Sequence, residues 1–180
     1  MIERIIIAGA GGQGVMLLGK VMAEAALKEG KHVTWFPCYG PEVRGGKAYC
    51  MVVIADTPIG SPFVQKADTL IIMNEPSFVK FKNRINPKGL LLVNSSLVDK
   101  TLFSSLRKAK LYAYAFTDSA SALGDVRVAN MIALGSFLAH KKILKPQTIR
   151  EVMVEMAPSE KKDLIAINER ALEEGLKLYG

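Results

Sequence analysis

The sequence predicts an α/β fold in which a doubly wound, mostly parallel sheet precedes a helical C-terminal part. An apolar run at residues 4–8 leads through a glycine-rich turn into a helical pattern at 15–26. Further apolar segments of strand length alternate with helical or turn patterns, which is typical of a sheet covered by helices on both faces. From residue 126 onward every pattern is helical. The predicted strands after the first lie at 32–37, 49–55, 69–74, 90–94 and 111–116.

The first turn has the sequence GAGGQG and lies between a predicted strand and a predicted helix. Gly9, Gly11 and Gly14 match G-x-G-x-x-G, a pattern that permits a tight turn, a close backbone approach to a ligand and close helix–strand packing. The N–H groups at the start of the helix would face a phosphate in the crevice. We therefore interpret these glycines, with Gly12 and Gln13, as candidate cofactor-binding residues in a Rossmann-like fold. A turn that only packs the first helix is the alternative.

The second half of a dinucleotide fingerprint is missing. An NAD site needs an acidic residue about 20 residues after the glycines, at the end of the second strand. The predicted strand at 32–37 runs into Cys38 instead, and the first carboxylate after it is Glu42. The pattern therefore indicates the fold and disfavours an NAD site.

The loop after the second strand, residues 38–47, is the most unusual in the chain. Pro41 restricts its backbone, Gly45 and Gly46 permit turns that other residues resist, and Glu42 and Arg44 place opposite charges two residues apart. Because the loop leaves the carboxyl end of a strand, we expect it beside the glycine turn. We interpret it as a clamp in which Arg44 contacts an anionic group or a neighbouring subunit. An ordered connection held by a Glu–Arg pair is the alternative.

Local signals predict the remaining elements. About ten residues separate the strands at 32–37 and 49–55, which is short for a helical crossover, so we expect a mixed sheet there. We also expect an edge strand at 59–62, a helix from Pro76 to about Ile85, and a turn at 86–89. Ser95 or Ser96 would cap a polar helix over 97–108.

Three helices are predicted in the C-terminal part, at 126–140, at 146–157 and after a cap at Ser159. The first is apolar nearly all round, which predicts burial within the domain or against a partner. Asn130 interrupts its apolar surface. We expect its amide to satisfy nearby backbone groups, with a ligand-facing amide as the alternative.

Composition excludes several classes of protein. With 180 residues the chain is expected to form one domain, residues 1–180. Two cysteines, Cys38 and Cys50, are too few for a zinc or iron–sulfur framework and indicate a reduced, intracellular protein. No apolar run is long enough for a membrane span and no leader peptide is recognisable, so we expect a cytoplasmic protein. The net charge of +7 is scattered, which argues against nucleic-acid binding, with one local basic patch at 140–145.

No catalytic constellation is recognisable. His32 and His140 lack an obvious nucleophile, and no pair of carboxylates forms a convincing acid–base couple. Gly124-Asp125 matches only the opening of a thiamine diphosphate motif, since Val126 replaces the next glycine. We therefore predict no catalytic residues and no metal ligands in this chain, and expect a subunit that depends on the chemistry of its partners.

Three motifs carry a family resemblance that extends over essentially the whole chain. GAGGQGV at 9–15, YGPEVRGG at 39–46 and IGSP at 59–62, in this order, resemble the gamma subunit of 2-oxoacid:ferredoxin oxidoreductases. The resemblance implies a complex that converts a 2-oxo acid and coenzyme A to acyl-CoA, CO2 and reduced ferredoxin. It implies that thiamine diphosphate, Mg2+ and the Fe-S clusters reside on other subunits, and that this chain alone binds none of them. The implied partners are alpha and beta subunits, with delta as a further candidate, and ferredoxin through the complex.

The resemblance also suggests a branch of the family. GGKAYC at 45–50 and VNSS at 93–96 look more like the 2-oxoglutarate branch than the pyruvate branch, although branched-chain 2-oxoacid and indolepyruvate enzymes share much of the pattern. Within this reading, Arg44 is implied to contact a CoA phosphate or a catalytic-subunit surface. Two alternatives stay open: a self-sufficient dinucleotide- or flavin-binding oxidoreductase, and an architectural dimerisation domain without CoA contact. The isolated chain could also form a homodimer through its apolar helices.

Overall fold

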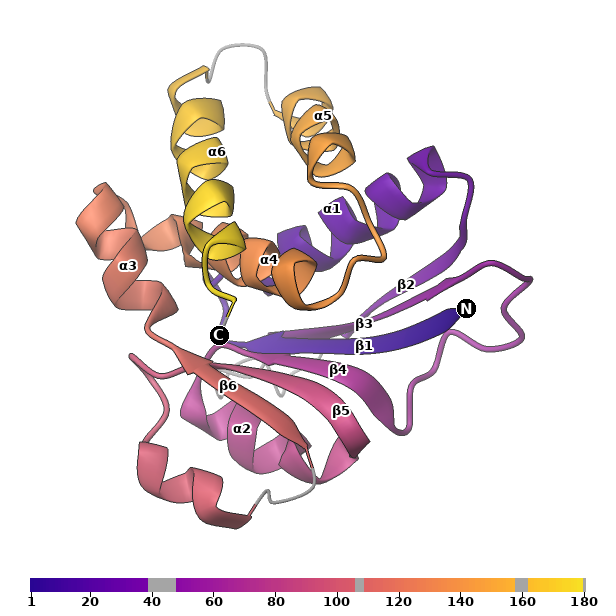
Figure 1. The fold of residues 1–180 in the computed structure, drawn as a ribbon, viewed down its shortest axis with the longest axis horizontal. Helices are drawn as coiled ribbons and strands as arrows, with labels where there is room; N and C mark the ends of the chain where they lie inside the picture. Colours follow the sequence, from indigo (N-terminus) through magenta and orange to yellow (C-terminus); the bar gives the residue numbers. More distant parts are fainter. Residues whose placement is uncertain (39–47, 106–108, 158–161, 180) are drawn as a thin grey trace.

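The computed structural model describes residues 1–38, 48–105, 109–157 and 162–179. Within them, a six-stranded sheet has the order β2-β3-β1-β4-β5-β6 (Figure 1). β1, β4, β5 and β6 are parallel, whereas β3 is antiparallel to both β1 and β2. The predicted mixed sheet at the β2–β3 connection is therefore confirmed. The strands are β1 Ile2–Gly9, β2 His32–Cys38, β3 Ala48–Ala55, β4 Ala67–Ile72, β5 Ile85–Asn94 and β6 Lys110–Tyr114.

Helices cover both faces of the sheet, which confirms the doubly wound α/β prediction (Figure 1). α1 and α4 pack on one face, with α5 and α6 farther from the sheet, whereas α2 packs on the other face. The α-helices are α1 Val15–Lys28, α2 Glu75–Phe81, α3 Phe116–Leu123, α4 Ala129–His140, α5 Pro146–Met156 and α6 Lys162–Leu176. Short 3₁₀ helices are η2 Lys82–Arg84, η3 Lys100–Ser105 and η4 Val126–Val128.

The core has two layers because successive residues of a strand point to opposite faces of the sheet. In β1, Ile5 and Ile7 pack toward α1 and α4, whereas Ile6 packs toward Phe78 of α2. All of these side chains are fully buried. Continuous apolar runs in β1 and β3 are thus explained by cover on both sides, as expected for central strands of such sheets.

Helix α4 lies at the centre of the helical layer (Figure 1). Every residue from Ala129 to Leu138 is buried, as its uniformly apolar sequence predicted. The helix separates the sheet from α6, so it needs apolar side chains on both sides.

The predicted edge strand at 59–62 is wrong, because residues 56–66 form no strand. This segment is instead anchored by side chains. Arg84 donates hydrogen bonds to the carbonyls of Val64 and Gln65, and the Val64 side chain is fully buried. The turn predicted at 86–89 is also wrong, since these residues belong to β5. A register shift opposite Ala67–Thr69 and a positive φ of 64° at Lys88 let the strand continue through Pro87.

Two further predictions need correction in the next segments. Where a helix was expected over 97–108, the described residues form only the short 3₁₀ helix η3. The side chain that accepts an N–H at its start is that of Asp99, from Thr101 at 2.8 Å, and not that of a serine. The last strand ends at Tyr114, and Phe116 begins the unpredicted helix α3. Gly124, at φ 103°, ends α3 in the left-handed conformation that favours glycine. The predicted cap at Ser159 lies outside the described residues.

Candidate functional site

At the carboxyl ends of the neighbouring strands β1 and β4, the chain connections run toward opposite edges of the sheet. The two strands are parallel neighbours, but β1 leads through α1 to the β2 edge, whereas β4 leads through α2 toward β6. α1 and α2 also pack on opposite faces. In open α/β sheets the chain then separates above the two strands and leaves a crevice for a ligand. The glycine turn at 9–14 directly follows β1, so it lies where such a crevice is expected.

Gln13 holds the turn against the end of β4. Its side-chain oxygen accepts the N–H of Ala10 at 2.6 Å, and its amide nitrogen donates to the carbonyl of Met73 at 3.2 Å. The backbone N–H of Gln13 also donates to the carbonyl of Ala10 at 3.2 Å. Because both ends of its amide are engaged, Gln13 shapes the turn from within.

The four glycines of the turn divide into two kinds. A Cβ on Gly9 would lie 2.9 Å from the Cβ of Met73, and a Cβ on Gly14 would lie 2.3 Å from the side-chain nitrogen of Asn130. These two glycines are required by close packing. A Cβ on Gly11 or Gly12 would meet no atom within 4 Å, and both residues are exposed. Gly12 has a φ of 87°, which favours glycine for conformational reasons alone. The open approach to the backbone is therefore at Gly11 and Gly12.

The start of α1 has the electrostatics of an anion site. Gly14 occupies the N-cap with φ 67°, no side chain caps the helix, and its first turn contains no acidic residue. The partial positive charge of a helix N-terminus is then left for an external group. The role of the turn in binding a cofactor stays a prediction.

Asn130 joins α4 to the glycine turn. The residue is 2% exposed, its side-chain nitrogen donates to the carbonyl of Gly14 at 3.2 Å, and its side-chain oxygen accepts the N–H of Met131 at 2.9 Å. The structure thus favours the backbone-satisfying interpretation of this amide over the ligand-facing one.

Two asparagines at the same edge were given no role at the site from the sequence, although Asn94 belongs to the VNSS motif. Asn94, fully buried at the end of β5, donates to the carbonyl of Met73 at 3.2 Å and to the hydroxyl of Thr117 at 2.8 Å. Asn74 caps α2 by accepting the N–H of Ser77 at 3.1 Å, and the hydroxyl of Ser77 donates to the carbonyl of Gly9 at 3.3 Å. The signal that could have found them is an asparagine directly after each long apolar run, LIIM and LLLV.

The second predicted site segment lies outside the described residues. This concerns Pro41, Glu42, Arg44, Gly45 and Gly46. The strands that flank it are described: β2 ends at Cys38, and β3 begins at Ala48, which pairs with Gly9. The end of β2 and the start of β3 therefore lie at the edge of the sheet that carries the glycine turn.

The two cysteines point to opposite faces of the β2–β3 hairpin. Cys38 pairs with Tyr49 across the two strands, and Pro37 pairs with Cys50. Because successive residues of a strand point to opposite faces, the two thiols lie on opposite sides of the sheet. Cys50 donates to the carbonyl of Val15 at 3.4 Å, and burial raises the pKa of its thiol to about 12. Cys50 is thus a packing residue that ties β3 to α1.

The histidines do not meet at the crevice. His140 ends α4, where its Nδ1 lies 2.8 Å from the carbonyl of Ser136 and its ring packs 4.2 Å from that of Tyr112, measured between centroids. Over the described part of the chain, no three His, Cys, Asp or Glu side chains group as metal ligands would. Likewise, none of the described helices combines the length and apolarity that a bilayer span requires.

Comparison with known proteins decides the family. A family model described as pyruvate ferredoxin/flavodoxin oxidoreductase matches residues 4–178. The chain belongs to this family. The resemblance inferred from the three motifs is thereby confirmed.

Curated relatives within the family include subunits of two kinds of 2-oxoacid enzyme. The chain is 36% identical over 173 residues to the ketoisovalerate oxidoreductase subunit VorA of Methanothermobacter marburgensis, covering 96% of this chain and 35% of that protein. It is 32% identical over 174 residues to the 2-oxoglutarate synthase subunit KorC of Methanocaldococcus jannaschii, covering 93% of this chain and 91% of that subunit. The chain therefore spans about a third of VorA but nearly all of KorC.

Solved structures share the fold. The gamma subunit of a keto/oxoacid ferredoxin oxidoreductase from Geobacter sulfurreducens superposes with a TM-score of 0.82 and 29% identity, covering 97% of this chain and 96% of that one. A 2-oxoglutarate:ferredoxin oxidoreductase from Magnetococcus marinus, solved with 2-oxoglutarate, coenzyme A and succinyl-CoA bound, has a TM-score of 0.89 at 22% identity. The superposition covers 98% of this chain and 31% of that longer chain. At 22% identity, the similarity supports the fold alone.

Proposed function

We propose that this chain is the gamma subunit of a multi-subunit 2-oxoacid:ferredoxin oxidoreductase. The complex would oxidatively decarboxylate a 2-oxo acid with coenzyme A to give acyl-CoA, CO2 and reduced ferredoxin. The observation that carries the proposal is the family match over residues 4–178, together with relatives such as KorC that this chain matches over 91% of their length. The chain itself would contribute binding surface and no catalytic group.

Coenzyme A is the ligand we assign to the crevice. Its phosphates need N–H donors and positive potential, which the uncapped N-terminus of α1 supplies, and they need space, which is open at Gly11 and Gly12. Arg44, in the segment that starts and ends at the same edge, would hold phosphate oxygens in a bidentate manner. Gly9, Gln13 and Gly14 would keep the turn in shape.

The remaining chemistry is assigned to partner subunits. Thiamine diphosphate, Mg2+ and the Fe-S clusters would reside on alpha, beta and delta chains, and ferredoxin would be reduced there. We further propose that the complex acts in the cytoplasm, since its reduced thiols, Cys38 and Cys50, are unpaired.

The 2-oxo acid we favour is 2-oxoglutarate, on the GGKAYC and VNSS motifs. Relatives carry both the 2-oxoglutarate and the ketoisovalerate name, so the substrate must be measured. The test is co-expression of this chain with the products of adjacent genes, followed by assay of viologen reduction with 2-oxoglutarate, pyruvate and 2-oxoisovalerate. Activity that requires this chain and is highest with 2-oxoglutarate is the expected result. Undiminished activity without this chain would refute the subunit role.

A further inference from the structure

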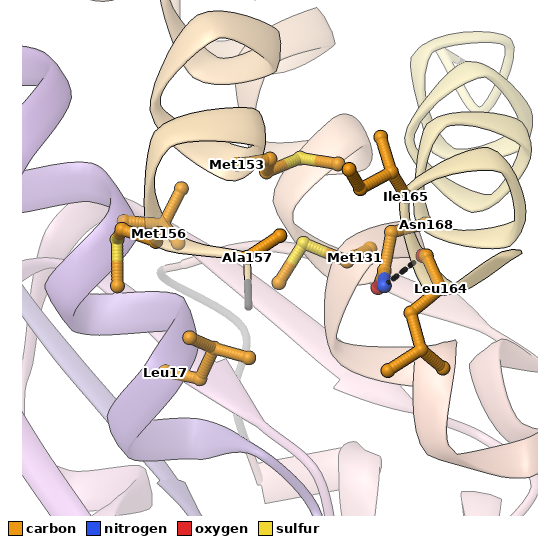
Figure 2. A pocket seen from close by; sticks show the side chains of 9 residues that line it. Leu17, Met131, Met153, Met156, Ala157, Leu164, Ile165 and Asn168 are labelled. Atoms are coloured by element: carbon orange, nitrogen blue, oxygen red, sulfur yellow. Dashed lines mark hydrogen bonds between the residues drawn. The ribbon is translucent and has the colours of Figure 1, made fainter. Parts of the chain in front are cut away.

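A cavity away from the glycine turn lies between four helices on the outer side of the helical layer. It has a volume of about 150 Å³, is lined by residues of α1, α4, α5 and α6, and is open to solvent on one side (Figure 2). Figure 2 shows side chains from all four helices directed toward one space. Leu17, 46% exposed, lies at its mouth. The lining residues used below are Leu17, Met131, Met153, Met156, Ile165 and Asn168.

The lining determines the charge of a ligand. Among the described residues that line the cavity, none is charged, and Asn168 is the one polar side chain. A carboxylate, phosphate or ammonium group would lose its hydration without gaining a partner. The described lining therefore favours an uncharged ligand over the charged 2-oxo acid and coenzyme A of the proposed function.

The volume of the cavity and its methionines indicate the shape of the ligand. Apolar protein cavities of roughly 150 Å³ are known to bind a benzene-sized molecule. Methionine side chains are flexible and polarisable, and their sulfur atoms make favourable contacts with aromatic rings. Three methionines from α4 and α5 line this cavity. A flat ring is thus the best match to both its size and its walls.

Asn168 adds one directional feature. Its side-chain nitrogen donates to the carbonyl of Leu164 at 2.6 Å, which fixes the amide (Figure 2). Its side-chain oxygen has no hydrogen-bond partner among the described residues, so it offers an acceptor within the cavity.

We propose that this cavity is a binding site for a small uncharged aromatic molecule that carries one hydrogen-bond donor, of which phenol is the simplest example. The ring lies against Met131 and Met153, and its donor is directed to the oxygen of Asn168. The site is independent of the coenzyme A crevice, although α1 and α4 contribute to both.

The experiment measures dissociation constants of phenol, toluene and benzoate with the full chain by ligand-observed NMR. Phenol and toluene bind, and benzoate binds at least about tenfold more weakly. Leu17→Asp, which puts a charge at the exposed mouth, weakens phenol and toluene at least about tenfold. Leu27→Asp is the matched control, because Leu27 is 56% exposed on the same helix and does not line the cavity.

A second variant tests the hydrogen bond. In Asn168→Leu the ratio of phenol affinity to toluene affinity falls several-fold, because only phenol uses the acceptor. An unchanged ratio would overturn the assigned donor. Absence of phenol and toluene binding to the wild-type chain, or equal binding to Leu17→Asp and Leu27→Asp, would overturn the site itself. Circular dichroism spectra and melting curves of each variant verify that it is folded.

Discussion

Gly135 of α4 and Gly175 of α6 face each other where the two helices cross. A Cβ on Gly135 would lie 2.9 Å from the Cα of Gly175 and 2.2 Å from the carbonyl oxygen of Leu172. A Cβ on Gly175 would lie 2.1 Å from the carbonyl oxygen of Ile132. The obstacles are backbone atoms, which cannot rotate away. The two helices thus pack backbone to backbone, and this contact fixes α6 on the buried helix α4.

Adding a methyl group at this crossing should therefore destabilise the fold. We expect Gly135→Ala and Gly175→Ala each to lower the free energy of unfolding by about 1–3 kcal/mol, the usual cost of overpacking. For a chain of 180 residues each kcal/mol lowers Tm by about 2–4 °C. Gly60→Ala is the control, since a Cβ there meets nothing within 4 Å. Equal melting temperatures for all three variants would contradict the described crossing.

The glycine turn allows binding to be separated from folding. Gly11→Asp adds a negative charge at an exposed backbone position where a Cβ meets nothing within 4 Å. We expect a normal melting temperature but a KM for coenzyme A raised at least about tenfold in the assembled enzyme, because the carboxylate repels phosphate. Gly14→Ala should behave differently, with a lowered melting temperature, since its methyl group would collide with Asn130. A KM unaffected by Gly11→Asp would place coenzyme A elsewhere.

From the sequence, Arg44 is the residue expected to contact a phosphate of coenzyme A. In the assembled enzyme, Arg44→Ala should raise the KM for coenzyme A by about tenfold or more, and Arg44→Lys should restore only part of it, because lysine lacks the bidentate fork. The measurement is initial rate against coenzyme A concentration at saturating 2-oxo acid. If KM stays the same in Arg44→Ala, the architectural interpretation of this chain gains support.

Cys50 should be chemically silent in the folded chain. Its thiol has a pKa raised to about 12 by burial, so iodoacetamide at pH 8 should label Cys38 and leave Cys50 unmodified until denaturant is added. The raised pKa also means that the unfolded chain loses this proton first. The contribution of Cys50 to stability is therefore complete below its ordinary pKa of 9.0 and is lost as the pH rises toward 12. Mass spectrometry of the labelled peptides reports the order of reaction, and fast labelling of Cys50 in the native chain would contradict the described burial.

The sequence by itself determined the order and type of most elements. Apolar runs such as Ile5–Ala8 and Leu90–Val93 are local patterns that predict strands, and the uniformly apolar α4 predicted its own burial. The glycine turn could be recognised because its pattern is contiguous. Local signals failed where a strand had a competing turn residue: Pro87 and Gly89 suggested a turn, but pairing with β4 and a single positive φ at Lys88 kept them in β5.

Only the tertiary structure decided what the individual residues of the turn do. The sequence cannot distinguish Gly9 and Gly14, which are required by contacts to Met73 and Asn130, from Gly11 and Gly12, which face open space. Nor could it show that Gln13 holds the end of β4, or that residues from four helices line one methionine-rich cavity. The physical reason is that a hydrogen bond such as that between Asn130 and Gly14 joins positions 116 residues apart. Such contacts leave no periodic trace along the chain and exist only once both ends are folded together.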